Sequence, residues 1–127
     1  MTHGEREKYV ARLLTNRRYT QPNKCELSLG VLLQEIYPNE YKYCGNFSVI
    51  IGGKNPDFFN INGQKKVIEM YGDHWHDPGS EAPRIEHFKS YGFDCLVIWE
   101  HELKNLPREE LAEKIKCFHQ RISYVTT

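Results

Sequence analysis

Two short apolar segments joined by a tight turn, within residues 55–76, constrain this fold more than any other stretch of the sequence. Residues 56–61 are rich in aromatic and β-branched side chains, and residues 65–71 form a second apolar run. Between them stands Asn62-Gly63, the pair that most favours a two-residue hairpin turn, because both positions of that turn need a positive φ. The sequence therefore predicts an antiparallel β-hairpin, which ends where Gly72 lets the chain turn sharply.

Two carboxylates interrupt this hairpin, at positions that a small domain should keep apolar. Burying Asp57 or Glu69 would cost roughly several kcal/mol unless a cation or a hydrogen-bond donor met the charge. Carboxylate and carbonyl oxygens suit Mg²⁺, and an imidazole close to the metal can move protons. Further candidates of both kinds follow in the next turn: Asp73, His74, His76 and Asp77. Taken alone, the hairpin is equally compatible with a metal site and with a solvated edge whose acids face water.

Composition bounds the remaining choices. The chain has 127 residues, enough for one domain, with 39% hydrophobic and 27% charged residues and a formal net charge of zero. The chain is not basic overall, so its net charge does not indicate nucleic-acid binding. A local cluster of basic residues can still provide the positive potential that attracts a nucleic acid. No window approaches the roughly 18 apolar residues of a membrane span, and residues 1–6 do not resemble a signal peptide. The four cysteines form no CxxC pair. We therefore expect free thiols and a cytoplasmic or nucleoid-associated protein that is not secreted.

The N-terminal part, residues 1–20, is predicted to form a basic helix ahead of a globular domain at residues 21–127. Apolar side chains recur at helical spacing within residues 4–18, and basic residues that include Arg17 and Arg18 lie among them. One interpretation is an amphipathic helix with a solvated face. The alternative is an arm that contacts phosphates, where each Lys or Arg contact adds salt-dependent affinity.

The other elements predict an α/β (α+β) domain. We expect helices at residues 24–37, after an N-cap at Asn23, at residues 81–91, and from residue 106 onward. Strands are expected at residues 47–51 and 94–99, besides the hairpin, with a polar loop at residues 39–46. Glu26 lies in a first helical turn, where the helix dipole alone explains an acid. The order αβββαβα suits a mixed four-stranded sheet flanked by helices.

Several of these segments together resemble one nuclease family. Asp57 after a proline, followed twelve residues later by Glu69, resembles the PD-(D/E)XK nuclease superfamily, although the usual lysine would fall at Tyr71 and is missing. A closer similarity, from about residue 25 to residue 103, is to the very-short-patch-repair (Vsr-like) endonucleases, which include the EDxHD homing endonucleases. It rests on Asp57 and on two segments, VIEMYGDHWH and GFDCLVIWEHEL.

The resemblance implies roles for individual residues. Asp57 and the Met70 carbonyl match metal ligands, and Glu69 matches the superfamily's strand carboxylate on the metal. His76 matches the general base or a phosphate-contacting group, and Glu26 matches an acid on the first helix. The last acid of the family falls nearest to Glu81, with Asp77 as the rival. Asp73 and His74 are additional candidates. Lys65, Lys66 and Arg84 are candidate DNA contacts or simply a solvated face, as are Arg17 and Arg18.

These matches imply a Mg²⁺- or Mn²⁺-dependent DNA endonuclease that nicks one strand or cuts both. Double-stranded DNA is the expected partner, and a homodimer on DNA is one expected arrangement. The chain is expected to be either a stand-alone enzyme or the catalytic module of a larger homing or mobile-element protein, with a role in repair as a further option. No structural zinc is expected, because no cysteine lies between Cys44 and Cys95. Trp75 is expected in the core rather than as a stacking platform for bases. The alternatives are a non-catalytic nucleic-acid-binding domain with a degenerate nuclease fold, and a metal-dependent hydrolase of another substrate.

Overall fold

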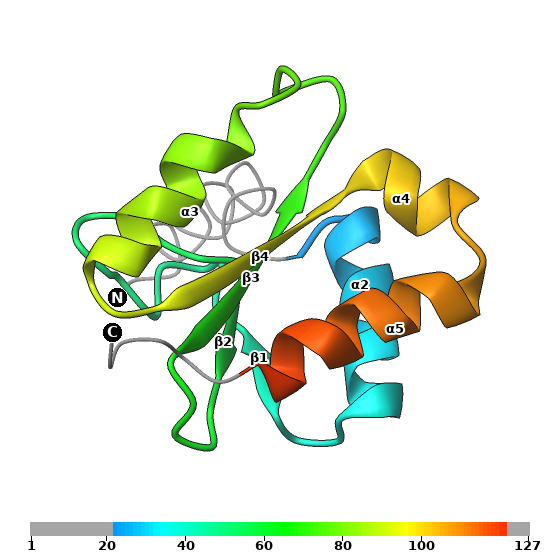
Figure 1. Cartoon of the computed structure of the whole chain (residues 1–127), viewed down its shortest axis with the longest axis horizontal. Coiled ribbons are helices and arrows are strands. Elements are labelled where there is room, and N and C mark those ends of the chain that lie inside the picture. The colour runs from blue at the N-terminus through cyan, green and yellow to red at the C-terminus, as the bar shows by residue number, and fades with distance from the viewer. Residues whose placement is uncertain (1–21, 122–127) are drawn as a thin grey trace, which may run out of the picture.

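The computed structural model describes residues 22–121, which form a four-stranded sheet covered by helices on both faces (Figure 1). The predicted helix of residues 1–20, with Arg17 and Arg18, lies outside the described residues. In chain order the elements are α2 (Lys24–Ile36), β1 (Tyr41–Tyr43), β2 (Phe58–Asn60), β3 (Lys66–Tyr71), α3 (Glu81–Ser90), β4 (Asp94–Trp99), α4 (Glu100–Asn105) and α5 (Arg108–Gln120).

The strands follow one another across the sheet in the order β1-β2-β3-β4. The pairs β1–β2 and β2–β3 are antiparallel, whereas β3 and β4 are parallel and are connected through α3. This mixed sheet confirms the predicted fold class. The predicted hairpin is also confirmed, with Phe58 opposite Ile68 and Phe59 opposite Val67.

Side chains that alternate along β3 divide the interior into two cores, because successive strand residues point to opposite faces of a sheet. Ile68 and Met70 pack with α2 and α5, while Val67 and Tyr71 pack with Phe88 of α3. In Figure 1, α2 and α5 accordingly lie on the face of the sheet opposite α3. Glu69 has the same parity as Val67 and Tyr71, so its carboxylate is on the α3 face.

Helix α2 begins as the sequence predicts, at an N-cap Asn23. The Asn23 side chain accepts a hydrogen bond from the Glu26 amide at 2.8 Å, and the Glu26 carboxylate accepts one from the Asn23 amide at 2.9 Å. This reciprocal capping box satisfies two amides that a helix start would otherwise leave without partners. It also brings Glu26 to the end of the sheet where β3 ends.

The predicted strand at residues 47–51 is wrong. Ile51 makes only an isolated bridge to Lys54, and Phe47 has a φ of 66°, outside the strand region. The side chain of Asn55 takes the place of a neighbouring strand, since its Nδ2 donates to the carbonyls of Cys44 at 2.6 Å and Val49 at 2.7 Å. The edge strand is instead β1, inside the segment predicted to be a polar loop.

Two smaller differences concern the hairpin turn and the end of β4. Paired residues stop at Phe59 and Val67, so the loop is longer than the predicted two-residue turn, although Gly63 does have a positive φ of 92°. Helix α4, which starts directly after Trp99, was not predicted from the sequence pattern. Among residues 22–121, no helix combines the length and the apolar character that a membrane crossing requires.

Candidate functional site

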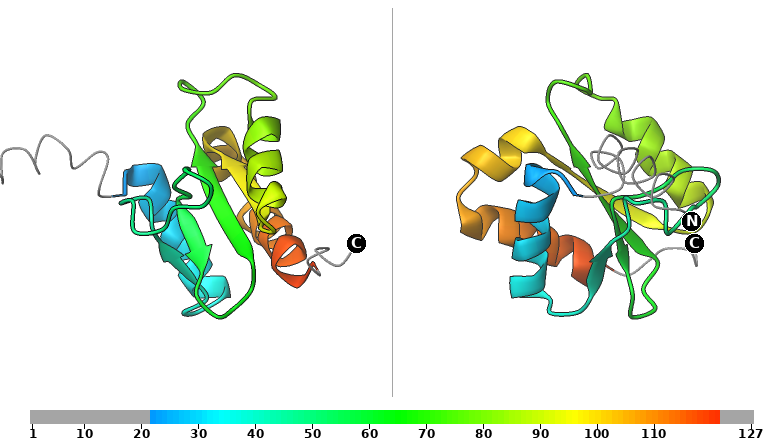
Figure 2. Two further views of the ribbon diagram at one scale, coloured as in Figure 1. Left: turned by 90° about the vertical axis from the view of Figure 1, so that its left-hand side faces the viewer. Right: turned by 180° about the vertical axis from the view of Figure 1, so that it is seen from behind.

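A cleft of about 520 Å³ lies at the C-terminal end of β3. The loop of residues 72–80 projects beyond this end of the strand, at the top of Figure 1 and of both views in Figure 2. The cleft is lined by Asn23, Cys25, Glu26, Asp57, Glu69, Met70, Tyr71, Gly72, His74, Trp75, His76, Arg84 and Glu100. The structure therefore brings Glu26, Asp57, Glu69, Met70 and His76 together, from positions up to 50 residues apart in the sequence.

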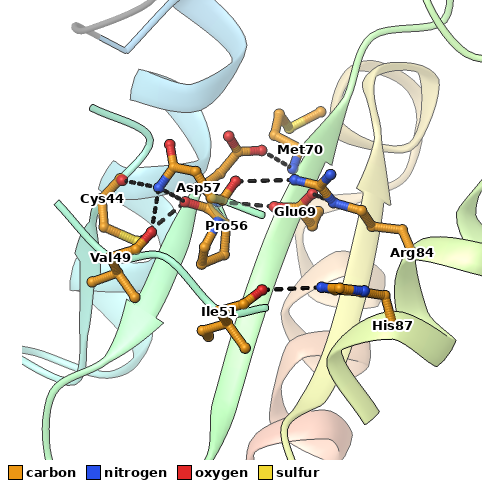
Figure 3. Close-up of polar contacts among 10 residues, drawn as sticks. Cys44, Val49, Ile51, Pro56, Asp57, Glu69, Met70, Arg84 and His87 are labelled. Carbon is orange, nitrogen blue, oxygen red and sulfur yellow. Dashed lines mark hydrogen bonds and ion pairs between the residues drawn. The ribbon is translucent and has the colours of Figure 1, made fainter. Parts of the chain in front are cut away.

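Asp57 lies just before β2 and faces the neighbouring strand. Its Oδ2 accepts a hydrogen bond from the backbone amide of Met70 at 2.8 Å (Figure 3). Burial raises the pKa of Asp57 well above its ordinary value, and the negative charges of Glu69 and Glu26 raise it further. The amide hydrogen bond acts in the opposite direction but does not cancel these effects. When this carboxyl group is ionised, the Met70 amide is the one described hydrogen-bond donor to it, and a cation bound beside it would lower its pKa again.

Glu69 is 3% exposed and both of its oxygens accept hydrogen bonds. Oε1 accepts from the amide of Asp57 at 2.9 Å, and Oε2 pairs with Nε of Arg84 at 2.7 Å (Figure 3). Burial raises the pKa of Glu69, whereas the Arg84 guanidinium and the Asp57 amide lower it. An isolated carboxylate at this depth would be costly, and Arg84 supplies the compensating charge.

Glu26 has two roles in the same place. Its carboxylate completes the capping box of α2, as its position in the first turn suggests, and it also lines the cleft with Asp57, whose pKa its negative charge raises. Two neighbouring carboxylates repel each other unless a proton or a cation lies between them. The helix cap therefore accounts for part of this residue's position, but not for its closeness to Asp57.

His76 stacks on Tyr71, with ring centroids 3.7 Å apart and planes 10° from parallel. Trp99 meets the imidazole edge-on at 6.4 Å. Burial lowers the pKa of His76, and the positive charge of Arg84 lowers it further. The imidazole is thus neutral near pH 7 and can accept a proton at the mouth of the cleft.

Two of the other acids predicted for the site lie around a second hollow of about 320 Å³, which His76 also lines. Asp73 pairs there with Nδ1 of His101 at 2.7 Å, and Glu81 opens α3 with its Oε1 buried and without a hydrogen-bond partner among the described residues. Asp77 lines neither hollow, and its carbonyl accepts the Ser80 amide at 3.0 Å. Asp73, Glu81 and Asp77 are thus not on the walls of the cleft.

The donor set in the cleft fits a hard divalent cation. The N–H and C=O of a strand residue point toward the same neighbouring strand. The carbonyl of Met70 therefore faces the side of β3 on which its amide bonds to Asp57. Carboxylate and carbonyl oxygens are what Mg²⁺ and Mn²⁺ prefer. Within residues 22–121, no three His, Cys, Asp or Glu side chains are arranged to hold a metal ion by themselves, so a backbone or water oxygen would have to complete the coordination.

The predicted DNA-contacting residues are separated by the fold. Arg84 lines the cleft, while Lys65 and Lys66 lie at the opposite end of β3. Lys66 is only 3% exposed and donates to the carbonyl of Arg121 at 2.7 Å, so it cannot meet a phosphate in this conformation. Its place at the start of an apolar strand gave no sign of this partner, because Arg121 is 55 residues away in the sequence.

Some cleft residues were not predicted for the site. Trp75 was expected in the core, but it is 84% exposed on the projecting loop, and this prediction is wrong. Gly72 and Asp73 could have indicated the exposure of Trp75, because glycine and aspartate favour turns and turns lie at the surface. Glu100 also lines the cleft and accepts the Asp73 amide at 3.2 Å. It was missed together with α4, whose first residue it is.

Comparison with known proteins identifies the fold. The sequence matches no protein-family model and no curated protein. Among solved structures, the chain is similar to one described as "Homing Endonuclease I-Bth0305I Catalytic Domain", with a TM-score of 0.58 and 21% sequence identity. The match covers 76% of this chain and 94% of that chain. At this identity the similarity establishes a shared fold, in agreement with the predicted mixed sheet flanked by helices.

Proposed function

We propose that this protein is a metal-dependent DNA endonuclease that hydrolyses phosphodiester bonds and leaves 5′-phosphate and 3′-hydroxyl ends. The observation that carries the proposal is the convergence of Glu26, Asp57 and Glu69 around one cleft, with His76 beside them. Acidic groups that lack compensating charge, next to a neutral imidazole, are what metal-assisted hydrolysis requires. The fold shared with a homing endonuclease catalytic domain supports DNA as the substrate.

Asp57, Glu69 and the Met70 carbonyl would hold a Mg²⁺ or Mn²⁺ ion, and Glu26 lies next to them. When bound, the ion would neutralise the charge that develops on the phosphate during hydrolysis. Asp57 is the residue most in need of such a cation, because its only described hydrogen-bond donor is the Met70 amide, while its charged neighbours are carboxylates. Glu69, by contrast, is already balanced by Arg84.

His76 would act as the general base that takes a proton from the attacking water, or as a direct contact to the phosphate. Its lowered pKa keeps the imidazole neutral at pH 7, the form that accepts a proton. The stack on Tyr71 fixes the plane of the ring, so its orientation does not depend on the substrate. This arrangement supplies a base without the lysine that is typical of the superfamily.

Cleavage of supercoiled plasmid in Mg²⁺, Mn²⁺ or EDTA tests the proposal. We expect conversion to nicked or linear DNA in either metal and none in EDTA, with loss of cleavage in Asp57→Ala and a fall of about 100-fold or more in His76→Ala. The ratio of nicked to linear product would distinguish a single-strand nick from a double-strand cut. A panel of plasmids, or of long genomic DNA, guards against the absence of a rare target site.

Two outcomes would contradict the proposal. Equal cleavage by wild type, Asp57→Ala and His76→Ala would remove the assigned residues from the chemistry. DNA binding that persists in EDTA, without cleavage of any substrate in the panel in either metal, would favour a non-catalytic nucleic-acid-binding domain instead.

A further inference from the structure

Arg84 is the one Lys or Arg among the thirteen described residues that line the cleft, which also include four acids. Arg84 is the fourth residue of α3, the helix on the face of the sheet opposite α2 (Figure 1). Its side chain is 27% exposed, so the guanidinium is neither sealed in the core nor free in solvent. The contacts of the guanidinium group show what role a positive charge has in this position.

Three contacts fix the guanidinium. Nε pairs with Oε2 of Glu69 at 2.7 Å (Figure 3). An Nη donates to the carbonyl of Asn55 at 3.0 Å. The guanidinium carbon lies 5.3 Å from the ring centroid of Phe88, a fully buried residue one turn further along α3. A planar fork held by a carboxylate, a carbonyl and an aromatic face has little rotational freedom left.

Both polar partners of Arg84 lead to Asp57. Oε1 of Glu69 accepts the amide hydrogen of Asp57 at 2.9 Å, and Asn55 is two residues before Asp57 in the segment that leads into β2. Asn55 is itself fixed, because its side chain spans the carbonyls of Cys44 and Val49. The backbone that carries Asp57 is thus held from α3 through two separate connections.

We propose that Arg84 is a positioning residue that fixes Asp57 in the geometry needed for metal binding, acting through Glu69 and Asn55. The catalytic consequence of this inference rests on the function proposed above. Without the guanidinium, the buried Glu69 carboxylate loses its counter-charge and turns toward water or another donor, which releases the Asp57 amide. No sequence pattern marks this role, since Glu69 and Arg84 are 15 residues apart on different elements.

Backbone amide exchange tests the positioning directly and needs neither DNA nor cleavage. In metal-free protein, Arg84→Met should lower the exchange protection of the Asp57 amide about tenfold or more, relative to amides in the centre of β4. Arg84→Lys keeps the charge but cannot reach Glu69 and Asn55 together, so an intermediate loss is expected. Arg108→Met, which removes an exposed ion pair with Glu35 far from the cleft, is the matched control and should leave the Asp57 amide unchanged.

Unchanged protection of the Asp57 amide in both Arg84 variants would overturn the inference. A general loss of structure would show itself in two ways: as reduced protection of the amides in β4, and as a lower unfolding temperature, which is measured for each variant in parallel. Arg84→Lys then carries the test if Arg84→Met does not fold. A wild type that fails to cleave DNA would remove the proposed function, while the amide measurement would still decide the role of Arg84.

Kinetics separate positioning from a direct phosphate contact. A positioning role predicts that Arg84→Lys lowers kcat about 10- to 100-fold, with KM and the salt dependence of DNA binding close to wild type. In the Glu69→Gln/Arg84→Met double variant the two losses in kcat should be less than multiplicative, because both changes break the connection through Glu69. A higher KM, with a salt slope reduced by about one, would instead identify Arg84 as a phosphate contact and contradict the proposal.

Discussion

The two ends of β3 treat buried charge in opposite ways. At the start of the strand, Asp94 of the neighbouring β4 is 7% exposed and receives two hydrogen bonds from Arg121, each of 2.8 Å. Lys66 beside it donates to the Arg121 carbonyl and lies over the Phe118 ring. At the other end, Asp57 receives the Met70 amide, and two further carboxylates lie close to it. One end is balanced, and the other carries an excess of negative charge.

The difference indicates which end is built for stability and which for binding. A buried ion pair with matched hydrogen bonds closes the sheet against the end of α5, and nothing more is needed there. The cleft end keeps an arrangement that is unfavourable in the metal-free protein. Such local conflicts persist where a ligand resolves them, which is the pattern expected at functional sites.

The largest effect expected from this comparison is on cleavage. Asp57→Asn should reduce metal-dependent DNA cleavage by roughly 10³-fold or more, about 4 kcal/mol of transition-state stabilisation, because the neutral amide cannot replace a carboxylate on the metal. Above the raised pKa of Asp57, the same change should stabilise the metal-free protein by about 1–2 kcal/mol, since it removes an uncompensated buried charge. Rates from plasmid cleavage and chemical unfolding of the same preparations would show both effects, and a destabilised Asp57→Asn protein would contradict the comparison.

The balanced end should respond to the equivalent change in the opposite way. Asp94→Asn removes the bidentate acceptor of the half-exposed Arg121, and we expect a loss of about 1–3 kcal/mol in the free energy of unfolding. Cleavage per folded molecule should stay within about twofold of wild type, because Asp94 is not in the cleft. Urea unfolding measures the first quantity. A stabilised Asp94→Asn protein would show that the two ends do not differ as described.

A smaller effect, on the order of 1 kcal/mol, is expected from pH in the absence of divalent metal. Asp57 and Glu69 have pKa values raised by folding, so their contribution to stability is fully present below their unfolded pKa values and is lost as the pH rises through the folded ones. His76 and His119 have lowered pKa values and act in the opposite direction as the pH falls below about 6.5.

Comparing wild type with Asp57→Asn at each pH isolates the carboxylate, because the histidine contributions cancel in the difference. The stability advantage of Asp57→Asn should be largest above the raised pKa of Asp57 and should shrink as the pH falls through it. A difference that stays constant over this range would mean that Asp57 is not held ionised against an unfavourable environment.

The sequence predicted the parts of this structure that depend on local pattern. Asp57 and Glu69 stood out because they are acids within apolar strands, and the N-cap at Asn23 followed from a local helix signal. The strand β1 could not be predicted in the same way, since three residues are too few to show an alternation, and residues 47–51 have strand composition without a strand partner. Composition alone cannot report that Asn55 occupies the place of such a partner.

Long-range partners were the other limit. The ion pairs of Arg84 with Glu69 and of Arg121 with Asp94 join residues 15 and 27 positions apart, and they decide which charges are balanced. The family resemblance indicated Glu26 and His76 as site residues, but it indicated neither the stacking of His76 on Tyr71 nor the exposure of Trp75. Local chemistry therefore identified the candidate acids, while tertiary packing determined how they are balanced.

Calorimetric titration of the metal-free protein with Mn²⁺ tests the central claim most directly. If the excess negative charge at the cleft end is a divalent cation site, wild type and Asp94→Asn should bind one Mn²⁺ with similar affinity, and Asp57→Asn should lose this binding. Binding should also raise the unfolding temperature of the first two proteins but not of the third. Equal Mn²⁺ affinity in wild type and Asp57→Asn, or no binding by wild type, would contradict the account.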